Sequence, residues 1–301
     1  MRPQSIDRTA SVRVIDAPWE ARSWVRERNA QGRRVAFVPT MGALHEGHLS
    51  LVRRAAELAD DVVVSVFVNP TQFGPNEDFA RYPRTWDQDL TLLSQERVGM
   101  VFAPRPDQMY SPRFSTLVSP PAVAVPWEGQ FRAGHFQGVC TVVLKLFQVV
   151  PAQVAVFGQK DYQQARVISD MVDDLNLDIA VDVYPTLRDA DGLALSSRNR
   201  YLPVADRDRA LGLSRALELV ERRYREGVRD AGELETSMVE ELNRAAVDSI
   251  DYAVVVDPLT LLPFTAPLPE AGPGSGGEPI AVALITARVA GTRLLDNRLL
   301  R

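Results

Sequence analysis

The chain contains 301 residues, more than the about 100 to 200 of a typical single domain, and 46% of them are hydrophobic. Two domains around one shared cleft are therefore expected. The formal net charge of −5 argues against a nucleic-acid partner, because nucleic-acid binders carry a basic surface that displaces counterions from phosphates. Any site for a polyanion must be local.

Targeting features and cysteine content narrow the class further. Residues 1–14 contain no apolar run typical of a secretory signal, and no segment approaches the roughly 20 apolar residues of a membrane span. We therefore expect a cytoplasmic protein with no membrane partner. The single cysteine, Cys140, excludes an internal disulfide and a cysteine-based zinc site. Its apolar neighbours favour a buried small side chain over a nucleophile.

Short β-branched runs alternate with helical patterns up to about residue 186. Helices are predicted to begin near residues 47, 86, 138 and 160. The pattern predicts an α/β domain, 1–186, whose parallel sheet is covered on both faces. Its buried strands are expected at 35–38, 62–68, 100–103, 153–157 and 177–183.

The pattern changes after residue 186. Two helices, 204–226 and 231–247, precede three strands predicted at 251–256, 280–289 and 292–297. This order predicts a smaller α+β domain, 187–301. A Pro/Gly-rich stretch, 263–279, interrupts the strands and is expected to be a mobile surface loop.

Residues 39–48 read PTMGALHEGH and follow the first predicted strand. In open α/β sheets ligands bind beyond the carboxyl ends of strands, and a helix N-terminus there offers backbone N–H groups to phosphate. Gly42 and Gly47 allow close approach, while His45 and His48 add side-chain donors. The H-x-G-H spacing resembles the signature of the nucleotidyltransferase superfamily. The alternative is a capping histidine followed by a core histidine.

Two further segments carry chemically suitable groups. FGQKDYQQ, 157–164, opens a helix on which Gln164 shares a stripe with apolar residues, so it either meets a ligand or is a satisfied core amide. Lys160 lies at the carboxyl end of a strand and is either a phosphate ligand or a surface lysine. ADGLALSSRNRYL, 190–202, places two hydroxyls and a cation in succession, which suits a diphosphate but also occurs in helix caps.

A long loop, 65–85, follows the second predicted strand and places Gln72 at the same edge of the sheet. Asp87 and Asp89 come next, in the first turn of a helix. They are equally consistent with Mg²⁺ ligands and with helix caps.

Taken together, these strings closely resemble the pantothenate synthetase (pantoate–beta-alanine ligase) family. The resemblance covers residues 33–298 in the order of the family, through VPTMGALHEGH, SVFVNPTQF, GHFQGVCTVVLKL, FGQKDYQQ, DGLALSSRNRYL and TRLLDN. It implies a Rossmann-like N-terminal domain, a small C-terminal domain that acts as a lid, and a homodimer. The implied reaction joins (R)-pantoate to β-alanine with ATP and Mg²⁺, through a pantoyl adenylate, and releases AMP and diphosphate.

The resemblance also assigns residues to the nucleotide. His48 is the candidate proton donor, and His45, Lys160, Ser196, Ser197 and Arg198 would act on the phosphates. Leu187 and Leu195 would flank the adenine. The complete ATP set is Met41, Gly42, Ala43, Leu44, His45, Glu46, Gly47, His48, Gly158, Gln159, Lys160, Asp161, Leu187, Leu195, Ser196, Ser197 and Arg198.

The other substrates are assigned in the same way. Gln72 and Gln164 would hold pantoate, and β-alanine would enter near Pro39 and Gln72. The dimethyl carbon of pantoate would lie against Met41, Val139 and Val143. The metal ligand expected from the family pattern is Asp89, although Gln88 interrupts the acidic run. His135 is expected to border the cleft.

Other functions remain open at this point. A different H-x-G-H nucleotidyltransferase would transfer a nucleotide to a small phosphorylated acceptor, but that acceptor needs cations where Gln72 and Gln164 are found. An aminoacyl-tRNA synthetase conflicts with the net charge and with the absence of an anticodon-binding appendage. A nucleotide-binding regulatory module would not need the Ser196–Arg198 string.

Overall fold

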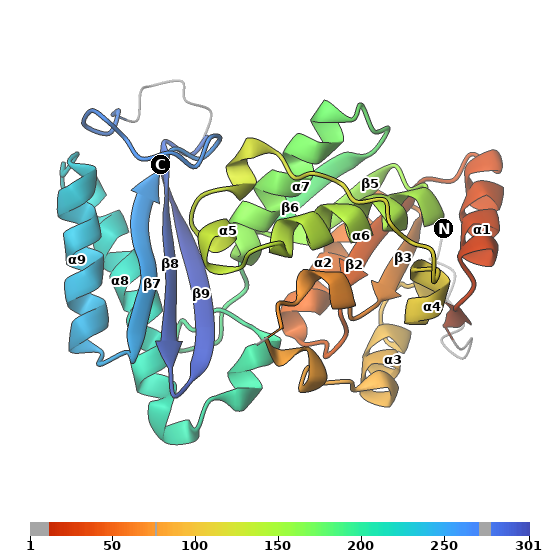
Figure 1. Cartoon of the computed structure of the whole chain (residues 1–301), viewed down its shortest axis with the longest axis horizontal. Helices are drawn as coiled ribbons and strands as arrows, with labels where there is room; N and C mark the ends of the chain where they lie inside the picture. The colour runs from red at the N-terminus through yellow and green to blue at the C-terminus, as the bar shows by residue number, and fades with distance from the viewer. Residues whose placement is uncertain (1–11, 76, 271–277) are drawn as a thin grey trace, which may run out of the picture. The chain divides into compact units, whose positions relative to one another are not determined.

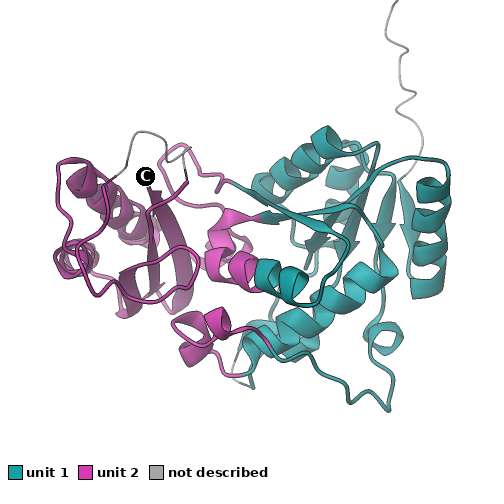
Figure 2. Ribbon diagram, turned by 90° about the horizontal axis from the view of Figure 1, so that it is seen from above, with its two compact units in different colours: residues 1–119, 134–157, 168–184 teal, residues 120–133, 158–167, 185–301 magenta. Residues whose placement is uncertain are grey.

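The computed structural model describes residues 12–75, 77–270 and 278–301, so residues 271–277 of the expected Pro/Gly loop lie outside the described part. The chain forms two compact units, coloured separately in Figure 2. The first unit comprises the chain up to Ser119 together with Gly134–Phe157 and Ile168–Tyr184. The second comprises Pro120–Ala133, Gly158–Val167 and Pro185–Arg301. The domain division at residues 186 and 187 stays a prediction, because the compact units interleave along the chain.

A six-stranded sheet in the order β1-β4-β3-β2-β5-β6 forms the centre of the first unit (Figure 1). The registers of β1 with β4, β4 with β3, β3 with β2 and β2 with β5 are all parallel. The predicted α/β fold is therefore confirmed. The strands are β1 Arg13–Ile15, β2 Val35–Thr40, β3 Asp61–Val66, β4 Met100–Phe102, β5 Val154–Gly158 and β6 Ala180–Tyr184.

Helices cover both faces of this sheet, as the continuous apolar strands require. Ala36 and Val38 of β2 belong to one apolar cluster with Val52 and Ala55 of α2. On the opposite face Phe37 meets Phe147 of α6, with the ring centroids 6.4 Å apart. The longer helices outside the second unit's C-terminal part are α1 Pro18–Ala30, α2 Glu46–Leu58, α3 Trp86–Ser94, α6 His135–Val149 and α7 Tyr162–Asp174.

Short elements fill the connections. The one-turn α-helices are α4 Pro106–Met109 and α5 Glu128–Phe131. The described 3-10 helices are η1 Pro70–Gln72, η2 Asp78–Ala80, η3 Ala122–Ala124, η4 Gln159–Asp161, η5 Ser197–Tyr201 and η6 Val204–Asp206. Among the described helices, none combines the length and the hydropathy that crossing a membrane requires.

The strand order positions the loops that matter for function. Strands β2 and β5 are neighbours, and the chain moves from β2 toward one edge of the sheet and from β5 toward the other. Ligands of open parallel sheets bind at the carboxyl ends of strands where the direction reverses. The segments that follow β2 and β5, 41–45 and 159–161, are therefore the first candidates for ligand contacts.

The second unit is an antiparallel sheet of three strands, with two helices on one face (Figure 1). Apolar residues of α8, α9, β7 and β8 form its core, among them Leu217, Leu234, Val255 and Ile285, which are fully buried. This arrangement confirms the smaller α+β part of the predicted fold. Its elements are α8 Arg207–Arg225, α9 Ala231–Arg244, β7 Ser249–Val256, β8 Ala281–Val289 and β9 Thr292–Leu300.

The segment 120–133, for which the sequence predicts no element, belongs to the second unit. Glu128 is 5% exposed, and its two carboxylate oxygens accept hydrogen bonds from Arg293 at 2.6 and 2.8 Å. Trp127 donates its indole N–H to the carbonyl of Leu261 at 2.8 Å. A buried carboxylate needs such a partner, so this ion pair fixes the segment against β9.

Candidate active site

The loop after β2 has an unusual backbone. Gly42 and Ala43 have φ values of 78° and 52°, and glycine adopts such a conformation without the steric cost other residues meet. A Cβ on Gly42 would also lie 3.0 Å from the Asp89 Oδ2 atom. The positive φ and the close approach of Asp89 therefore both favour glycine at position 42.

Asp89 of α3 anchors this loop. Its side chain is 1% exposed, and its Oδ2 and Oδ1 atoms accept the backbone N–H groups of Ala43 at 2.9 Å and Leu44 at 2.8 Å. Thr85 donates its hydroxyl to Oδ1 at 3.0 Å. Three protein donors thus occupy the carboxylate, which does not fit a metal ligand. Within the described ranges, no group of three or more His, Cys, Asp or Glu residues could hold a metal ion.

The two histidines of H-x-G-H have their Nδ1 atoms turned to the backbone. His45 is the N-cap of α2 and accepts the Gly47 N–H at 3.1 Å, while His48 accepts the His45 N–H at 3.3 Å. In a neutral imidazole with an acceptor Nδ1, the proton is on Nε2. Both rings therefore present Nε2–H donors, with their centroids 4.1 Å apart. Neither ring is fully buried, so the interpretation of His48 as a core residue is not supported.

Gln72 is held in a fixed orientation inside the first unit. Asn69, which is 1% exposed, donates from Nδ2 to the Gln72 side-chain oxygen at 3.1 Å. The Gln72 Nε2 group is thereby directed toward Met41, whose sulfur lies at 3.3 Å. His135 donates from Nδ1 to the Gln72 carbonyl at 2.9 Å. The role of Asn69 was not predicted, although an Asn-Pro pair directly after a strand is a turn signal that could have indicated it.

Close packing of α6 against η1 also holds Gln72 in place. A Cβ on Gly138 would lie 2.4 Å from the Thr71 carbonyl oxygen and 2.7 Å from the Gln72 Cα. Both distances are too short for a Cβ, so α6 or the backbone of η1 would have to move. Gly138 therefore permits this approach. Val139 and Val143 of α6 are 2% and 5% exposed, and Pro39 of β2 is half-buried.

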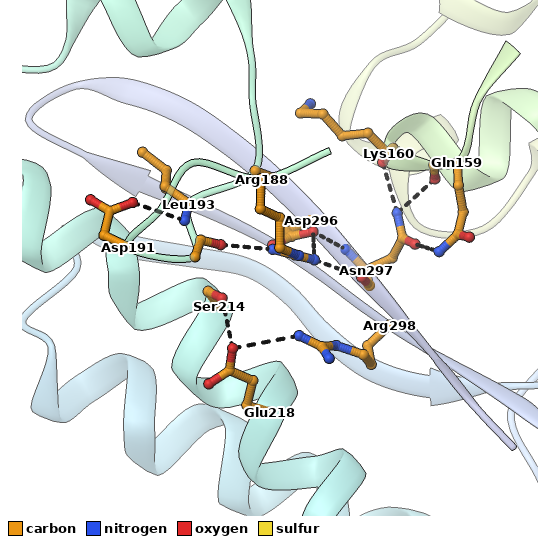
Figure 3. Close-up of polar contacts among 12 residues, drawn as sticks. Gln159, Lys160, Arg188, Asp191, Leu193, Ser214, Glu218, Asp296, Asn297 and Arg298 are labelled. Atoms are coloured by element: carbon orange, nitrogen blue, oxygen red, sulfur yellow. Dashed lines mark hydrogen bonds and ion pairs between the residues drawn. The ribbon is translucent and has the colours of Figure 1, made fainter. Parts of the chain in front are cut away.

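In the second unit, the turn η4 is fastened to β9. The Asn297 Nδ2 group donates to the carbonyls of Gln159 at 2.9 Å and Lys160 at 2.8 Å. Gln159 in turn donates from Nε2 to the Asn297 Oδ1 atom at 3.1 Å. Figure 3 shows this exchange beside the pair formed by Arg188 and Asp296. The main chain of Lys160 is therefore fixed, while its side chain extends away.

A short hairpin bridge precedes the Ser-Ser-Arg string. Arg188 pairs with Ala194 in an isolated antiparallel bridge, and the Leu195 N–H donates to the Leu187 carbonyl at 3.0 Å. The two leucines predicted to flank an adenine are thus neighbours. Leu187 is 37% exposed.

One pocket of the second unit gathers three of the predicted phosphate ligands. Lys160, Ser196 and Arg198 line it, together with Arg293 and Asp296. Ser196 also caps η5, because its hydroxyl accepts the Arg198 N–H at 3.2 Å. Ser197 is buried. The capping alternative for this string is therefore true of Ser196, but it coexists with a pocket rich in cations.

Adjacent glutamines on α7 differ in their surroundings. Gln163 is 5% exposed and makes three hydrogen bonds, to the carbonyls of Val123 and Pro126 and from the Glu128 N–H. Gln164 is half-buried. The satisfied core amide is thus Gln163, and Gln164 retains the predicted role of a ligand-binding residue as a hypothesis.

The structure divides the predicted residues between its two units. The first unit contains Pro39, Met41 to His48, Gln72, Asp89, Val139 and Val143, and the second contains Gly158 to Asp161, Gln164, Leu187 and Leu195 to Arg198.

Cys140 is fully buried on α6, and burial raises its thiol pKa to about 12. A thiol with so high a pKa is a poor nucleophile, so the prediction of a structural cysteine is confirmed.

Known proteins match this chain over nearly its whole length. The family model described as Pantoate-beta-alanine ligase matches residues 13–299. The chain belongs to this family. Curated relatives include the pantothenate synthetases of Thermotoga neapolitana, 45% identical over 96% of this chain and 100% of the relative, and Rhodopirellula baltica, 49% identical over 92% and 95%.

Solved structures agree with the family assignment. The pantothenate synthetase of Thermus thermophilus superimposes with a TM-score of 0.87 at 42% identity, covering 96% of this chain and 99% of that one. A pantoate-beta-alanine ligase of Francisella tularensis, complexed with beta-gamma ATP and beta-alanine, gives a TM-score of 0.75 at 30% identity, over 96% and 97%. The predicted family, fold and ligase class are confirmed.

The anchoring role of Asp89 in this ligase can be tested by Asp89→Asn. The amide keeps one acceptor but turns N–H donors toward a backbone N–H, so we expect the free energy of unfolding in urea to fall by about 1 to 3 kcal/mol. Millimolar Mg²⁺ should shift the unfolding midpoint of wild type and variant equally. If Mg²⁺ stabilises only the wild type, Asp89 is a metal ligand after all.

Proposed function

We propose that this chain condenses (R)-pantoate with β-alanine in two steps, using ATP and releasing AMP and diphosphate. The observation that carries the proposal is the pocket in which Lys160, Ser196 and Arg198 meet, although they come from separate segments of the chain. Two cations and a hydroxyl suit a polyphosphate. Family membership selects pantoate and β-alanine as the partners of that nucleotide.

The chemistry explains why a nucleotide is needed. A carboxylate and an amine form a salt at neutral pH, because the carboxylate oxygen is a poor leaving group. In the first step the pantoate carboxylate attacks the α-phosphorus of ATP, and diphosphate leaves. In the second step the amine of β-alanine attacks the activated carbonyl, loses a proton, and displaces AMP. Preorganised donors compensate the repulsion between the two anions in the first step.

The residues that the resemblance assigns to ATP are found in both units. In the first unit, the loop Met41 to His48 supplies backbone groups, and His45 and His48 supply Nε2–H donors to phosphate oxygens. In the second unit, Lys160 and the string Ser196 to Arg198 neutralise the departing diphosphate. Leu187 and Leu195 flank the adenine, and the turn Gly158 to Asp161 contacts the ribose side.

The pantoate site centres on Gln72. Its orientation by Asn69 leaves the Nε2 group directed at the Met41 side, where the amide can donate to a hydroxyl or carboxylate. Gln164 would be the second amide, and Met41, Val139 and Val143 would face the dimethyl carbon. β-Alanine would then enter near Pro39 and Gln72.

Mg²⁺ would be held through the phosphate oxygens of ATP. This fits the described residues, which contain no carboxylate cluster able to hold a metal ion, and it fits Asp89, whose oxygens are used by the loop. The homodimer, the lid role of the second domain and the cytoplasmic location stay predictions that rest on the resemblance.

The function is tested by supplying the purified chain with ATP and pantoate, with and without β-alanine. We expect continuous AMP formation only when both acids are present. Pantoate alone should give a single turnover that releases diphosphate and leaves pantoyl adenylate on the enzyme. Continuous diphosphate release with a phosphorylated acceptor in place of pantoate would identify a nucleotidyltransferase instead.

Substitution of His48 should slow the first step. His48→Ala removes the Nε2–H donor, so we expect the single-turnover rate of adenylate formation to fall by about 10² to 10³. His48→Asn places an acceptor near the Nδ1 position and preserves the bond from the His45 N–H, whereas His48→Gln places a donor near Nε2. A higher rate in Asn than in Gln would contradict the donor role.

The adjacent glutamines on α7 provide a matched pair. Gln164→Ala should raise KM for pantoate by about 10-fold, the cost of one lost hydrogen bond to a charged group, and should leave KM for ATP nearly unchanged. Gln163→Ala should instead lower the stability, because it removes the partners of Glu128, Val123 and Pro126. Equal changes of both KM values in Gln164→Ala would mean that Gln164 is structural.

A further inference from the structure

Two adjacent polar residues of β9 are both buried. Asp296 is 4% exposed and Asn297 is 2% exposed. Neighbouring residues of a strand point to opposite faces, so each of the two meets different surroundings. Buried polar side chains are costly unless their hydrogen-bonding capacity is used. In this pair the capacity is used almost entirely on the two segments that line the cationic pocket.

Asn297 provides hydrogen-bond partners for the turn that contains Lys160. Its single Nδ2 group donates to two successive carbonyls, those of Gln159 and Lys160, at 2.9 and 2.8 Å, and its Oδ1 atom accepts the amide of Gln159 at 3.1 Å. A 3-10 turn of three residues cannot satisfy these carbonyls itself. The side chain of Asn297 therefore determines where the main chain of Lys160 lies.

Asp296 satisfies the hairpin that leads to Ser196 and Arg198. It accepts a bidentate pair of hydrogen bonds from Arg188, at 2.7 Å to Oδ2 and 2.9 Å to Oδ1. Arg188, which lies beside Asp296 in Figure 3, also donates to the Gly192 carbonyl at 3.1 Å and so closes the hairpin. A bidentate pair fixes orientation as well as distance.

Both anchors share one rigid support. Asp296 and Asn297 are paired with Ile285 and Leu284 in the antiparallel register of β9 with β8. Two adjacent residues of one strand therefore hold both the turn that contains Lys160 and the hairpin that leads to Ser196 and Arg198. All of these residues belong to the second unit.

We propose that Asp296 and Asn297 are positioning residues for adenylation, which set the spacing between Lys160 and the Ser196–Arg198 string that the polyphosphate requires. This inference rests on the proposed function. Neither residue needs to touch the substrate. Their effect on the reaction passes through the cations of the pocket, and a displacement of a catalytic group by 1 Å can cost about 10²-fold in rate.

Asn297→Ala is the variant that tests the inference. Its single-turnover formation of pantoyl adenylate should be slower by about 10-fold or more, because Lys160 is no longer held. When preformed pantoyl adenylate is supplied with β-alanine, the variant should keep a rate near that of wild type. Preservation of the second step shows that the chain is folded.

A double-mutant cycle with Lys160→Ala gives the readout that a general loss of packing would not give. If Asn297 acts through Lys160, then Asn297→Ala should add less than about 2-fold to the loss already caused by Lys160→Ala. Losses that multiply fully would overturn the inference. So would a wild-type adenylation rate in Asn297→Ala.

The next residue of the strand is the matched control. Arg298 pairs with Glu221 at 2.7 Å and with Glu218 at 3.6 Å, both on α8, so Arg298→Ala removes polar contacts of the same strand without touching the Lys160 turn. We expect it to lower the unfolding midpoint but to retain the adenylation rate. An equal rate loss in Arg298→Ala would mean that β9 acts only through stability.

A second variant covers the case in which Asn297→Ala does not fold. Asn297→Asp keeps the shape and the acceptor for Gln159 but turns an oxygen toward two carbonyl oxygens, so it should slow adenylation at least as much. A wild-type rate in Asn297→Asp would refute the inference. Absence of pantoyl adenylate from the wild type would refute the proposed function as well, whereas its presence with unaffected variants would refute the inference alone.

Discussion

Backbone groups at the ends of parallel strands need hydrogen-bond partners, and this constraint shapes one candidate turn in each of the two units. After β2, the backbone N–H groups of Ala43 and Leu44 are satisfied by the carboxylate of Asp89. After β5, the carbonyls of Gln159 and Lys160 are satisfied by the amide of Asn297. The first turn offers backbone donors and the second offers backbone acceptors. In both, one buried side chain from a distant segment holds a short turn in a fixed shape.

This solution has a functional consequence. A turn held from behind by an anchor can keep its other side clear for a ligand, whereas a turn stabilised by its own bulky side chains cannot. Gly42 and Gly138 show how little space is left around the loop after β2 and around η1, since a Cβ at either position would be too close to a neighbouring atom. The small residues and the buried anchors are therefore parts of one arrangement, which determines where the imidazoles and the Gln72 amide lie.

Local patterns in the sequence locate β2 to β6, because continuous apolar runs such as VAFV indicate strands. The predicted burial is wrong for β6, which contains no buried residue. Local patterns are insufficient for β1, which has three residues, and for α1, where only Ala21, Trp24 and Val25 are buried among charged neighbours. The anchoring roles of Asp89 and Asn297 cannot be predicted from local patterns, for a different reason. Asp89 is separated from Leu44 by 45 residues and Asn297 from Lys160 by 137, and no periodicity encodes such a pairing. The sequence pattern leaves Asp89 equally consistent with a metal ligand and a helix cap, and neither alternative includes the loop anchor that the structure has there.

The net charge and the pocket can now be reconciled. The chain has more acidic than basic residues, 39 against 34, yet Lys160, Arg198 and Arg293 line one pocket. Cations that converge on one point repel each other unless carboxylates lie behind them. Glu128 accepts two hydrogen bonds from Arg293, and Asp251 accepts a third at 2.7 Å, while Asp296 lies at the pocket wall. The acidic surplus thus includes carboxylates that hold Arg293 in place, and a polyphosphate that enters the pocket meets hydrogen-bond donors whose positions are already determined.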